Sequence, residues 1–234
     1  MYPDPAGLVT TLHAMGVRLM VSVWAKFSNA ACIDALERSG DALVDVANNT
    51  EHYMDAWDPA TRATYFGLLN ASMFSIGVDA IWLDGSEPEG WPHLDNWLYP
   101  HGRDGPRVSG NRLFNGYALG ETSAVHDGLR AHYPDARPFT LTRASWAGQQ
   151  RTGGVLWSGD IKSTWPTLRR QVVASLNFGL SGMPYWSEDI GGFFRPDGQY
   201  ESDDFRQMLT RWFQFGAFTP VFRAHGTNGG TEYW

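Results

Sequence analysis

Several features that define common protein classes are missing from this 234-residue chain. Its single cysteine, Cys32, can form no internal disulfide and has no metal-ligand spacing around it. No stretch approaches the eighteen consecutive apolar residues typical of a membrane-spanning helix. Positive charge is also scarce, because the net charge is −7 and no basic run occurs. A disulfide framework, a membrane span and a nucleic-acid partner are therefore not expected.

The motifs of four large enzyme classes are absent as well. The chain contains no HExxH, no P-loop, no GxSxG and no GxGxxG. It therefore lacks the minimum parts of a zinc protease, a kinase-like enzyme, a serine hydrolase or a dinucleotide-binding enzyme. His126 and His132 are six residues apart on an expected helix, which places them on different faces. We interpret both as surface residues.

Aromatic residues, by contrast, are abundant. They make up 14% of the chain and include eleven tryptophans. Flat rings stack on sugar faces in carbohydrate-binding clefts, but tryptophan also fills ordinary cores, so composition leaves both interpretations open. A hydrophobic content of 43% in a chain of this length is enough for one sizeable core.

Strand and helix patterns alternate along the chain without a low-complexity linker. The expected helices cover residues 6–15, 58–77, 112–132, 164–180 and 202–217. The expected strands cover residues 17–24, 78–83, 137–142, 154–157 and 183–186. This order implies an α/β fold with a parallel sheet and helices outside it. About five strands are fewer than the eight of a closed barrel, so the pattern fits an open doubly wound sheet or part of a barrel.

One connection is unusually long. Residues 85–110 are rich in proline, glycine, histidine and tryptophan. Connections of this length are functional or disordered, and the aromatic content favours a functional, active-site loop.

Polar residues collect where the expected strands end. They are Trp24 to Lys26, Asp84 with Glu87, Thr142-Arg143, Trp157 to Asp160, and Trp186 to Asp189. One such cluster is explained by a helix cap, but five in succession are not. Catalytic groups of α/β barrels lie at the carboxyl ends of the strands. Asp84 and Asp160 are two carboxylates on separate strand ends, which is the minimum equipment for cleaving a glycosidic bond.

Four motifs resemble those of one enzyme family. Trp82-Leu83-Asp84-Gly85-Ser86-Glu87 resembles the nucleophile signature of glycoside hydrolase family 31, whose usual form is Trp-x-Asp-Met-Asn-Glu. Residues 141–160 resemble its acid/base region, and residues 182–193 resemble its next strand. Residues 211–226 are similar to its second signature. The resemblance runs from about Pro3 to Trp234, with the motifs in the family's order.

The resemblance implies a (β/α)₈ TIM barrel, of which this chain holds roughly strands three to seven. Residues 1–234 are then a single catalytic-barrel segment, incomplete at both ends, and the family's other domains are not included. Exposed sheet edges and exposed apolar helix faces follow from an unclosed barrel. No signal peptide is seen, and we expect the chain to begin within a longer protein, so localisation stays open.

The resemblance also implies a retaining α-glycosidase. Asp84 is its expected nucleophile and Asp160 its acid/base, at the separation of about 5–5.5 Å that retention requires. Further residues are expected around the sugar: Trp24, Lys26, Trp82, Glu87, Arg143, Trp157, Asp189 and His225. We expect Trp157 to desolvate Asp160 and raise its pKa. The two carboxylates supply the whole chemistry, so no metal and no organic cofactor is implied.

The expected substrate is an oligosaccharide or another α-glycoside. Gly85 replaces the usual methionine, and this variant resembles the branch that contains α-xylosidases acting on xyloglucan fragments, as does the stretch Val23 to Phe27. Two alternatives remain open. In the first alternative, the specificity is that of an α-glucosidase or α-transglucosylase. In the second, the isolated chain is an inert fragment or a weak carbohydrate-binding piece.

Overall fold

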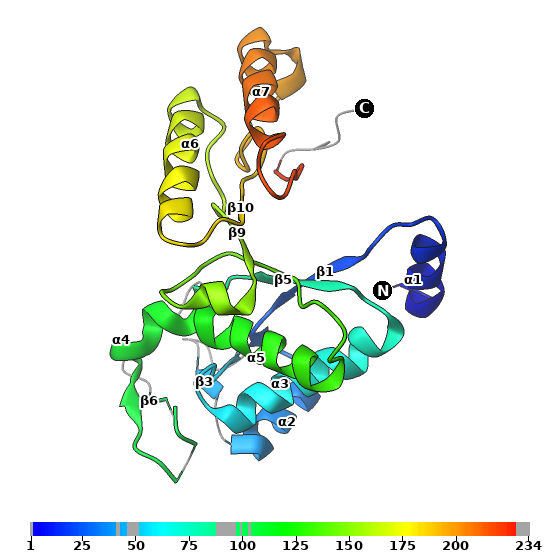
Figure 1. Ribbon diagram of the computed structural model, residues 1–234, viewed down its shortest axis with the longest axis vertical. Helices are drawn as coiled ribbons and strands as arrows, with labels where there is room; N and C mark the ends of the chain where they lie inside the picture. The colour runs from blue at the N-terminus through cyan, green and yellow to red at the C-terminus, as the bar shows by residue number, and fades with distance from the viewer. Residues whose placement is uncertain are drawn as a thin grey trace. The chain divides into compact units, whose positions relative to one another are not determined.

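A computed structural model describes residues 2–40, 43–45, 52–87, 97–98, 100–102 and 104–227. The chain divides into two compact units, Met1–Gly154 (unit 1) and Val155–Trp234 (unit 2). The main helices, shown in Figure 1, are α1 (Pro5–Ala14), α2 (Ala30–Gly40), α3 (Pro59–Ser72), α4 (Gly110–Leu113), α5 (Tyr117–His132), α6 (Trp165–Leu180) and α7 (Asp203–Gly216). The strands are β1 (Met20–Trp24), β2 (Lys26–Phe27), β3 (Leu43–Asp45), β4 (His52–Met54), β5 (Ala80–Asp84), β6 (Trp97–Leu98), β7 (Val108–Ser109), β8 (Thr140–Thr142), β9 (Val155–Trp157) and β10 (Trp186–Ser187).

Unit 1 is organised around three parallel strands. β5 lies between β1 and β8, with Trp24 opposite Asp84 and Leu83 opposite Thr142. This register brings the carboxyl ends of the three strands to one edge of the sheet. A smaller antiparallel sheet has the order β2-β4-β3, and β6 pairs with β7.

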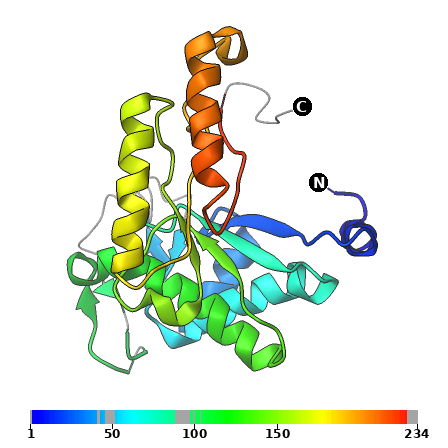
Figure 2. The same ribbon diagram turned by 45° about the horizontal axis from the view of Figure 1, so that its top comes forward.

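The two faces of β5 differ in burial. Ile81 and Leu83 are fully buried in the core that α2, α3 and α5 build with the sheet, and Figures 1 and 2 show these helices gathered on one side of the strands. Trp82 and Asp84 point to the opposite face, because side chains alternate along a strand, and both are only partly buried. The helix-covered face therefore carries stability, and the other face is available for a site.

Local sequence explains the start and the end of α3. The Asp58 side chain accepts a hydrogen bond of 2.8 Å from the Thr61 amide, and Pro59 occupies the first turn. The helix ends at Ser72, earlier than expected, and a 3₁₀ turn (Phe74–Ile76) follows. Gly77 closes that turn in the left-handed region at φ 98°.

Unit 2 contains two parallel strands and two long helices. Ser187 of β10 lies opposite Trp157 of β9, and α6 packs beside α7 (Figures 1 and 2). Thr164 caps α6 and Ser202 caps α7. Each side chain accepts a hydrogen bond from a backbone amide of the first turn. The core of this unit consists of Leu168, Ile190, Phe205, Met208 and Trp212.

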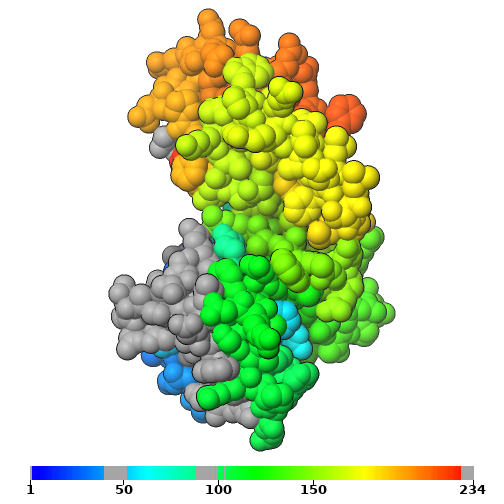
Figure 3. Space-filling model, turned by 90° about the vertical axis from the view of Figure 1, so that its left-hand side faces the viewer, coloured from blue at the N-terminus to red at the C-terminus, as the bar shows by residue number. Residues whose placement is uncertain are grey.

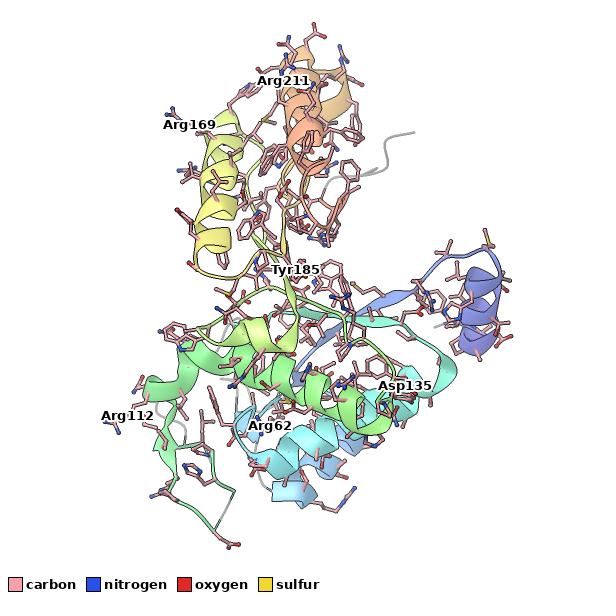
Figure 4. All side chains as sticks on the ribbon, viewed as in Figure 1. Arg62, Arg112, Asp135, Arg169, Tyr185 and Arg211 are labelled. Atoms are coloured by element: carbon pink, nitrogen blue, oxygen red, sulfur yellow. The ribbon has the colours of Figure 1, made fainter. Side chains whose placement is uncertain are left out.

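The outer surface of unit 2 carries both apolar and charged side chains. Val173, Leu176 and Leu180 of α6 are 54%, 65% and 88% exposed, and Figure 3 shows α6 (yellow) on the surface. The expectation of exposed apolar helix faces is thus confirmed for α6. Arg169 of α6 and Arg211 of α7 point outward as well (Figure 4).

Several boundaries differ from the sequence prediction. β1 and β8 each begin three residues later than expected, at Met20 and Thr140, and β10 lies at Trp186–Ser187 instead of 183–186. The expected helix over 112–132 is divided into α4, a 3₁₀ turn and α5. The helix α2 and the short strands β2, β3, β4, β6 and β7 were not predicted. Within the expected loop 85–110, residues 88–96, 99 and 103 lie outside the described residues.

Within the part of the chain that the structure describes, no helix has both the length and the apolar composition needed to cross a membrane.

Candidate active site

Unit 1 places Asp84 at the carboxyl end of its central strand. The register of β5 and β8 brings Arg143, the residue that follows the neighbouring strand β8, beside it. Arg143 Nη1 lies 3.7 Å from Asp84 Oδ1, and Arg143 Nε lies 3.1 Å from Glu87 Oε1. The Gly85 amide donates to the same Oδ1 at 2.9 Å. Both of these contacts go to Oδ1, and 24% of the Asp84 side chain is exposed.

The turn that carries Glu87 is fixed by a buried hydroxyl. Ser86 is fully buried, and its Oγ lies 3.0 Å from Thr142 Oγ1. The Ala144 amide donates to the same Ser86 Oγ at 2.9 Å. These bonds join the turn after β5 to the segment after β8, and so hold Glu87 and Arg143 next to each other.

Trp24 forms a flat apolar surface next to Asp84. Its ring lies so close to Gly85 that a Cβ on that glycine would stand 2.5 Å from ring atoms Cε3 and Cζ3. Gly85 also has φ 60°, which favours glycine. Lys26 Nζ lies 5.0 Å from the centre of the Trp24 ring, within range of a cation–π interaction. Trp82, two residues before Asp84 on β5, points to the same face.

Unit 2 builds its polar cluster around Asp189. This side chain follows β10, is fully buried, and forms an ion pair with Arg223 Nη2. The Arg223 guanidinium lies 5.1 Å from the centre of the buried Trp157 ring. Burial raises the pKa of Asp189 to about 7, although the Arg223 charge opposes the rise, and the Asp160 charge adds to it.

His225 is half-buried in the same unit. Its ring centre is 5.2 Å from that of Phe193. Burial, followed by the charges of Arg223 and Arg195, lowers the pKa of His225 to about 4. The imidazole is therefore neutral at neutral pH, with one nitrogen as a donor and the other as an acceptor.

Asp160 lies on the loop after β9 and is exposed. The Trp157 ring is buried against Arg223 within this unit, and the desolvation of Asp160 by Trp157 stays a prediction. The structure thus groups Trp24, Lys26, Trp82, Asp84, Glu87 and Arg143 in unit 1, and Trp157, Asp160, Asp189 and His225 in unit 2. Since the two carboxylates belong to different units, their separation stays a prediction.

Sequence reasoning missed three charged residues. Arg223 was visible two positions before His225, but its ion pair with Asp189 spans 34 residues of chain. Glu188 is fully buried next to Asp189, and burial raises its pKa to about 7. Glu121 is fully buried on α5 and accepts a hydrogen bond of 3.2 Å from the Tyr65 hydroxyl. Burial raises the pKa of Glu121 to about 8, and the charges of Glu87 and Asp84 contribute to the rise.

Among the described residues, no group of three or more histidine, cysteine, aspartate or glutamate side chains is arranged to hold a metal ion.

Comparisons with known proteins agree on one family. The model described as the glycosyl hydrolases family 31 TIM-barrel domain matches residues 1–234. The chain is 35% identical to an α-xylosidase from Saccharolobus solfataricus. The alignment covers the whole of this chain and 31% of that protein. It is 37% identical to an uncharacterised family 31 glucosidase from Pseudescherichia vulneris. This alignment covers 96% of this chain and 43% of that protein. A crystal structure of a family 31 α-xylosidase from a soil metagenome, complexed with xylose, superposes with a TM-score of 0.82 at 32% identity, covering 96% of this chain and 33% of that one.

This chain spans less than half of the length of these relatives. The parallel strands of both units are part of a TIM barrel, which confirms the prediction of a partial barrel over that of an open doubly wound sheet. By sequence and by fold, the chain belongs to glycoside hydrolase family 31, whose members are glycoside hydrolases.

Proposed function

We propose that this chain is the catalytic segment of a retaining α-glycoside hydrolase with α-xylosidase specificity. Asp84 attacks the anomeric carbon of the terminal sugar, and Asp160 protonates the leaving oxygen. Water then releases the sugar from Asp84, with Asp160 acting as the base. Arg143, Glu87, Asp189 and His225 bind hydroxyl groups or fix the two carboxylates, and the rings of Trp24, Trp82 and Trp157 shape the pocket.

The single observation that carries the proposal is the environment of Asp84. A nucleophile needs one oxygen held and the other directed at the substrate. The Gly85 amide and Arg143 both contact Oδ1, and the side chain remains 24% exposed at the carboxyl end of β5. The support for a sugar substrate comes from family membership, since the family's members are glycoside hydrolases.

Two relatives favour xylose. The Saccharolobus relative is named an α-xylosidase, and the soil-metagenome structure was determined with xylose bound. The Pseudescherichia relative is named a glucosidase, and this favours the second candidate, an α-glucosidase or α-transglucosylase. The two candidates share Asp84 and Asp160 and differ in the sugar or the acceptor.

The first test compares release of nitrophenol from aryl α-xyloside and aryl α-glucoside. The natural full-length protein that contains this chain is measured together with D84N and D135N. We expect faster xyloside hydrolysis and a loss of about 10³-fold or more in D84N. Asp135 is an exposed aspartate outside the proposed site, so D135N is the matched control and keeps parental activity. Parental rates in D84N would remove Asp84 from the proposed role.

A second test separates the two carboxylates by role. A dinitrophenyl leaving group departs without protonation, so D160N should form the covalent intermediate on such a substrate and stall before hydrolysis. A burst of dinitrophenol in D160N, with azide restoring turnover, is the expected result. An equal loss with mononitrophenyl and dinitrophenyl substrates would contradict the acid/base assignment.

The isolated 234-residue chain is tested separately. A cooperative thermal transition and hydrolysis of the xyloside would show that this part of the barrel works alone. If both are absent while the full-length protein is active, the isolated chain is an inert fragment.

A further inference from the structure

Three loops of unit 2 carry proposed site residues, and backbone hydrogen bonds join them. The loop after β9 carries Asp160, and the loop after β10 carries Asp189. The Phe193 and Phe194 amides donate to the Ile161 carbonyl at 2.8 Å and 3.0 Å, and the Ser163 amide donates to the Phe194 carbonyl at 3.3 Å. Gly192 packs directly on Ser163, because a Cβ at Gly192 would stand 2.6 Å from the Ser163 Oγ and 2.7 Å from its backbone.

The third segment follows α7 and carries Arg223 and His225. The Ile190 amide donates to the Arg223 carbonyl at 3.3 Å, and the Thr227 amide donates to the Phe193 carbonyl at 2.8 Å. This segment therefore runs along the loop that carries Asp189. None of the three is a helix or a strand of regular length, so their relative positions depend on such cross-links.

The guanidinium of Arg195 lies where two of these loops meet. Arg195 is only 2% exposed. Its Nη2 donates to the Ile190 carbonyl at 2.6 Å and to the His225 carbonyl at 3.1 Å, and its Nε donates to the Gly192 carbonyl at 2.9 Å. Its Nη1 donates to the Tyr200 hydroxyl at 3.3 Å. Two of these acceptors are close to proposed sugar-binding residues. The Ile190 carbonyl immediately follows Asp189, and the other carbonyl belongs to His225 itself.

Glycines leave the space that this guanidinium occupies. A Cβ at Gly226 would stand 2.7 Å from Arg195 Nε, and a Cβ at Gly191 would stand 3.3 Å from Nη2. Two other arginines of this unit, Arg169 and Arg211, are exposed and point into solvent (Figure 4). A buried charge with several backbone carbonyl acceptors is a feature of a fixed structural centre.

We infer that Arg195 is a positioning residue, which holds the Asp189 loop and the His225 segment in one arrangement through backbone carbonyls and does not touch the sugar. This inference rests on the proposed function, because it gives Asp189 and His225 their roles in sugar binding. Nη2 alone bonds carbonyls on both segments, while Nε and Nη1 bond the Gly192 carbonyl and the Tyr200 hydroxyl. The single ammonium nitrogen of a lysine cannot reach all four acceptors.

The test compares R195M, R195K and the exposed control R169M in the natural full-length protein. Displacement of binding groups by about 1 Å lowers catalytic efficiency by about 100-fold, which is the loss in kcat/KM that we expect for R195M. R195K keeps the charge and part of the hydrogen bonding, so its loss should be several-fold smaller. R169M should stay within about twofold of the parent. Parental kcat/KM in R195M, or equal losses in R195K and R195M, would overturn the inference.

A second measurement does not depend on catalysis. Proton or carbon NMR of histidine-labelled protein follows the titration of the His225 imidazole, assigned by the signal lost in H225Q. Burial is the largest cause of the lowered pKa of His225, the Arg223 charge is the second and the Arg195 charge the smallest. If Arg195 holds the His225 segment in its buried place, the segment moves towards solvent in R195M, and the pKa of His225 should rise from about 4 towards its ordinary value of about 6.5. An unchanged titration would show that Arg195 does not hold the His225 segment. If the parent protein hydrolyses neither glycoside, the proposed function fails, and this titration still decides whether Arg195 joins the two segments.

Discussion

The two units fix their proposed site carboxylates in different ways. In unit 1, Asp84 ends a regular strand, and the register with β8 brings Arg143 to it. This ion pair stays partly wet, with 24% of the Asp84 side chain exposed. In unit 2, Asp189 follows a strand of two residues, is fully buried, and meets an arginine from 34 residues further along the chain. For these two residues, regular sheet register holds a partly solvated ion pair, and a loop holds a buried ion pair.

The largest expected effect tests this contrast directly by comparing R223M with R143M. R223M leaves the buried Asp189 without its partner, which should lower the free energy of unfolding by about 3–5 kcal/mol. R143M removes a partner from two partly exposed acids, so the expected loss of stability is about 1 kcal/mol or less. Urea unfolding of the full-length protein measures both values. Equal losses in the two variants would remove the distinction between the units.

Glu121 is the buried acid of unit 1 and sharpens the comparison. Because its pKa is raised by folding, the folded state binds the proton more tightly, and stability falls as the pH rises from about 4.5 through about 8. E121Q lacks this dependence. At pH 8 we therefore expect E121Q to exceed the parent by on the order of 4 kcal/mol, and at pH 4 the two should be similar. Melting temperatures measured from pH 4 to 8 test this, and parallel curves would contradict it.

Gly85 gives the next effect in size. G85A combines left-handed backbone strain with a clash against the Trp24 ring, with an expected loss of stability of about 2–3 kcal/mol. The control is G16A, since Gly16 has φ 73° and no atom within 4 Å of a built Cβ. G16A should lose about 1 kcal/mol from backbone strain alone. Equal losses from thermal denaturation would show that the Trp24 ring moves aside freely.

The smallest effect concerns Asp79, at the amino end of β5. Burial tends to raise its pKa, but the Leu19 amide, His13 and Arg18 outweigh it and lower the pKa. A lowered folded-state pKa gives stability that is present above the unfolded value and lost as the pH falls through the folded value. D79N should therefore be about 1 kcal/mol less stable than the parent at pH 6. The difference should shrink as the pH falls below the ordinary aspartate pKa and disappear once the folded carboxyl is protonated; a difference that does not depend on pH would rule out an ionic origin.

The sequence predicted the elements that have strong local signals. Asp58 with Pro59 marked the start of α3, and Thr164 marked the start of α6, because capping depends on neighbouring residues. The strands β2, β3 and β4 were missed, since two or three residues are too few to show an alternating pattern.

The same distinction separates the site residues that were predicted from those that were not. Asp84, Arg143 and Asp189 belong to contiguous motifs, so their place at strand ends followed from the sequence. Arg195 and Glu121 carry no local sign of burial, because segments far apart along the chain close around them. Their roles depend on packing that only the folded structure displays.

The close packing of Trp24 on Gly85 has an evolutionary consequence. The Cβ of a methionine after the nucleophile, the usual residue of the family's motif, would stand 2.5 Å from the indole ring in its present position. A mutational path from this chain to the usual motif therefore requires the tryptophan to shift or to be replaced when the glycine changes. The two positions form an epistatic pair, and sequence variation at one of them is interpretable only with the residue at the other.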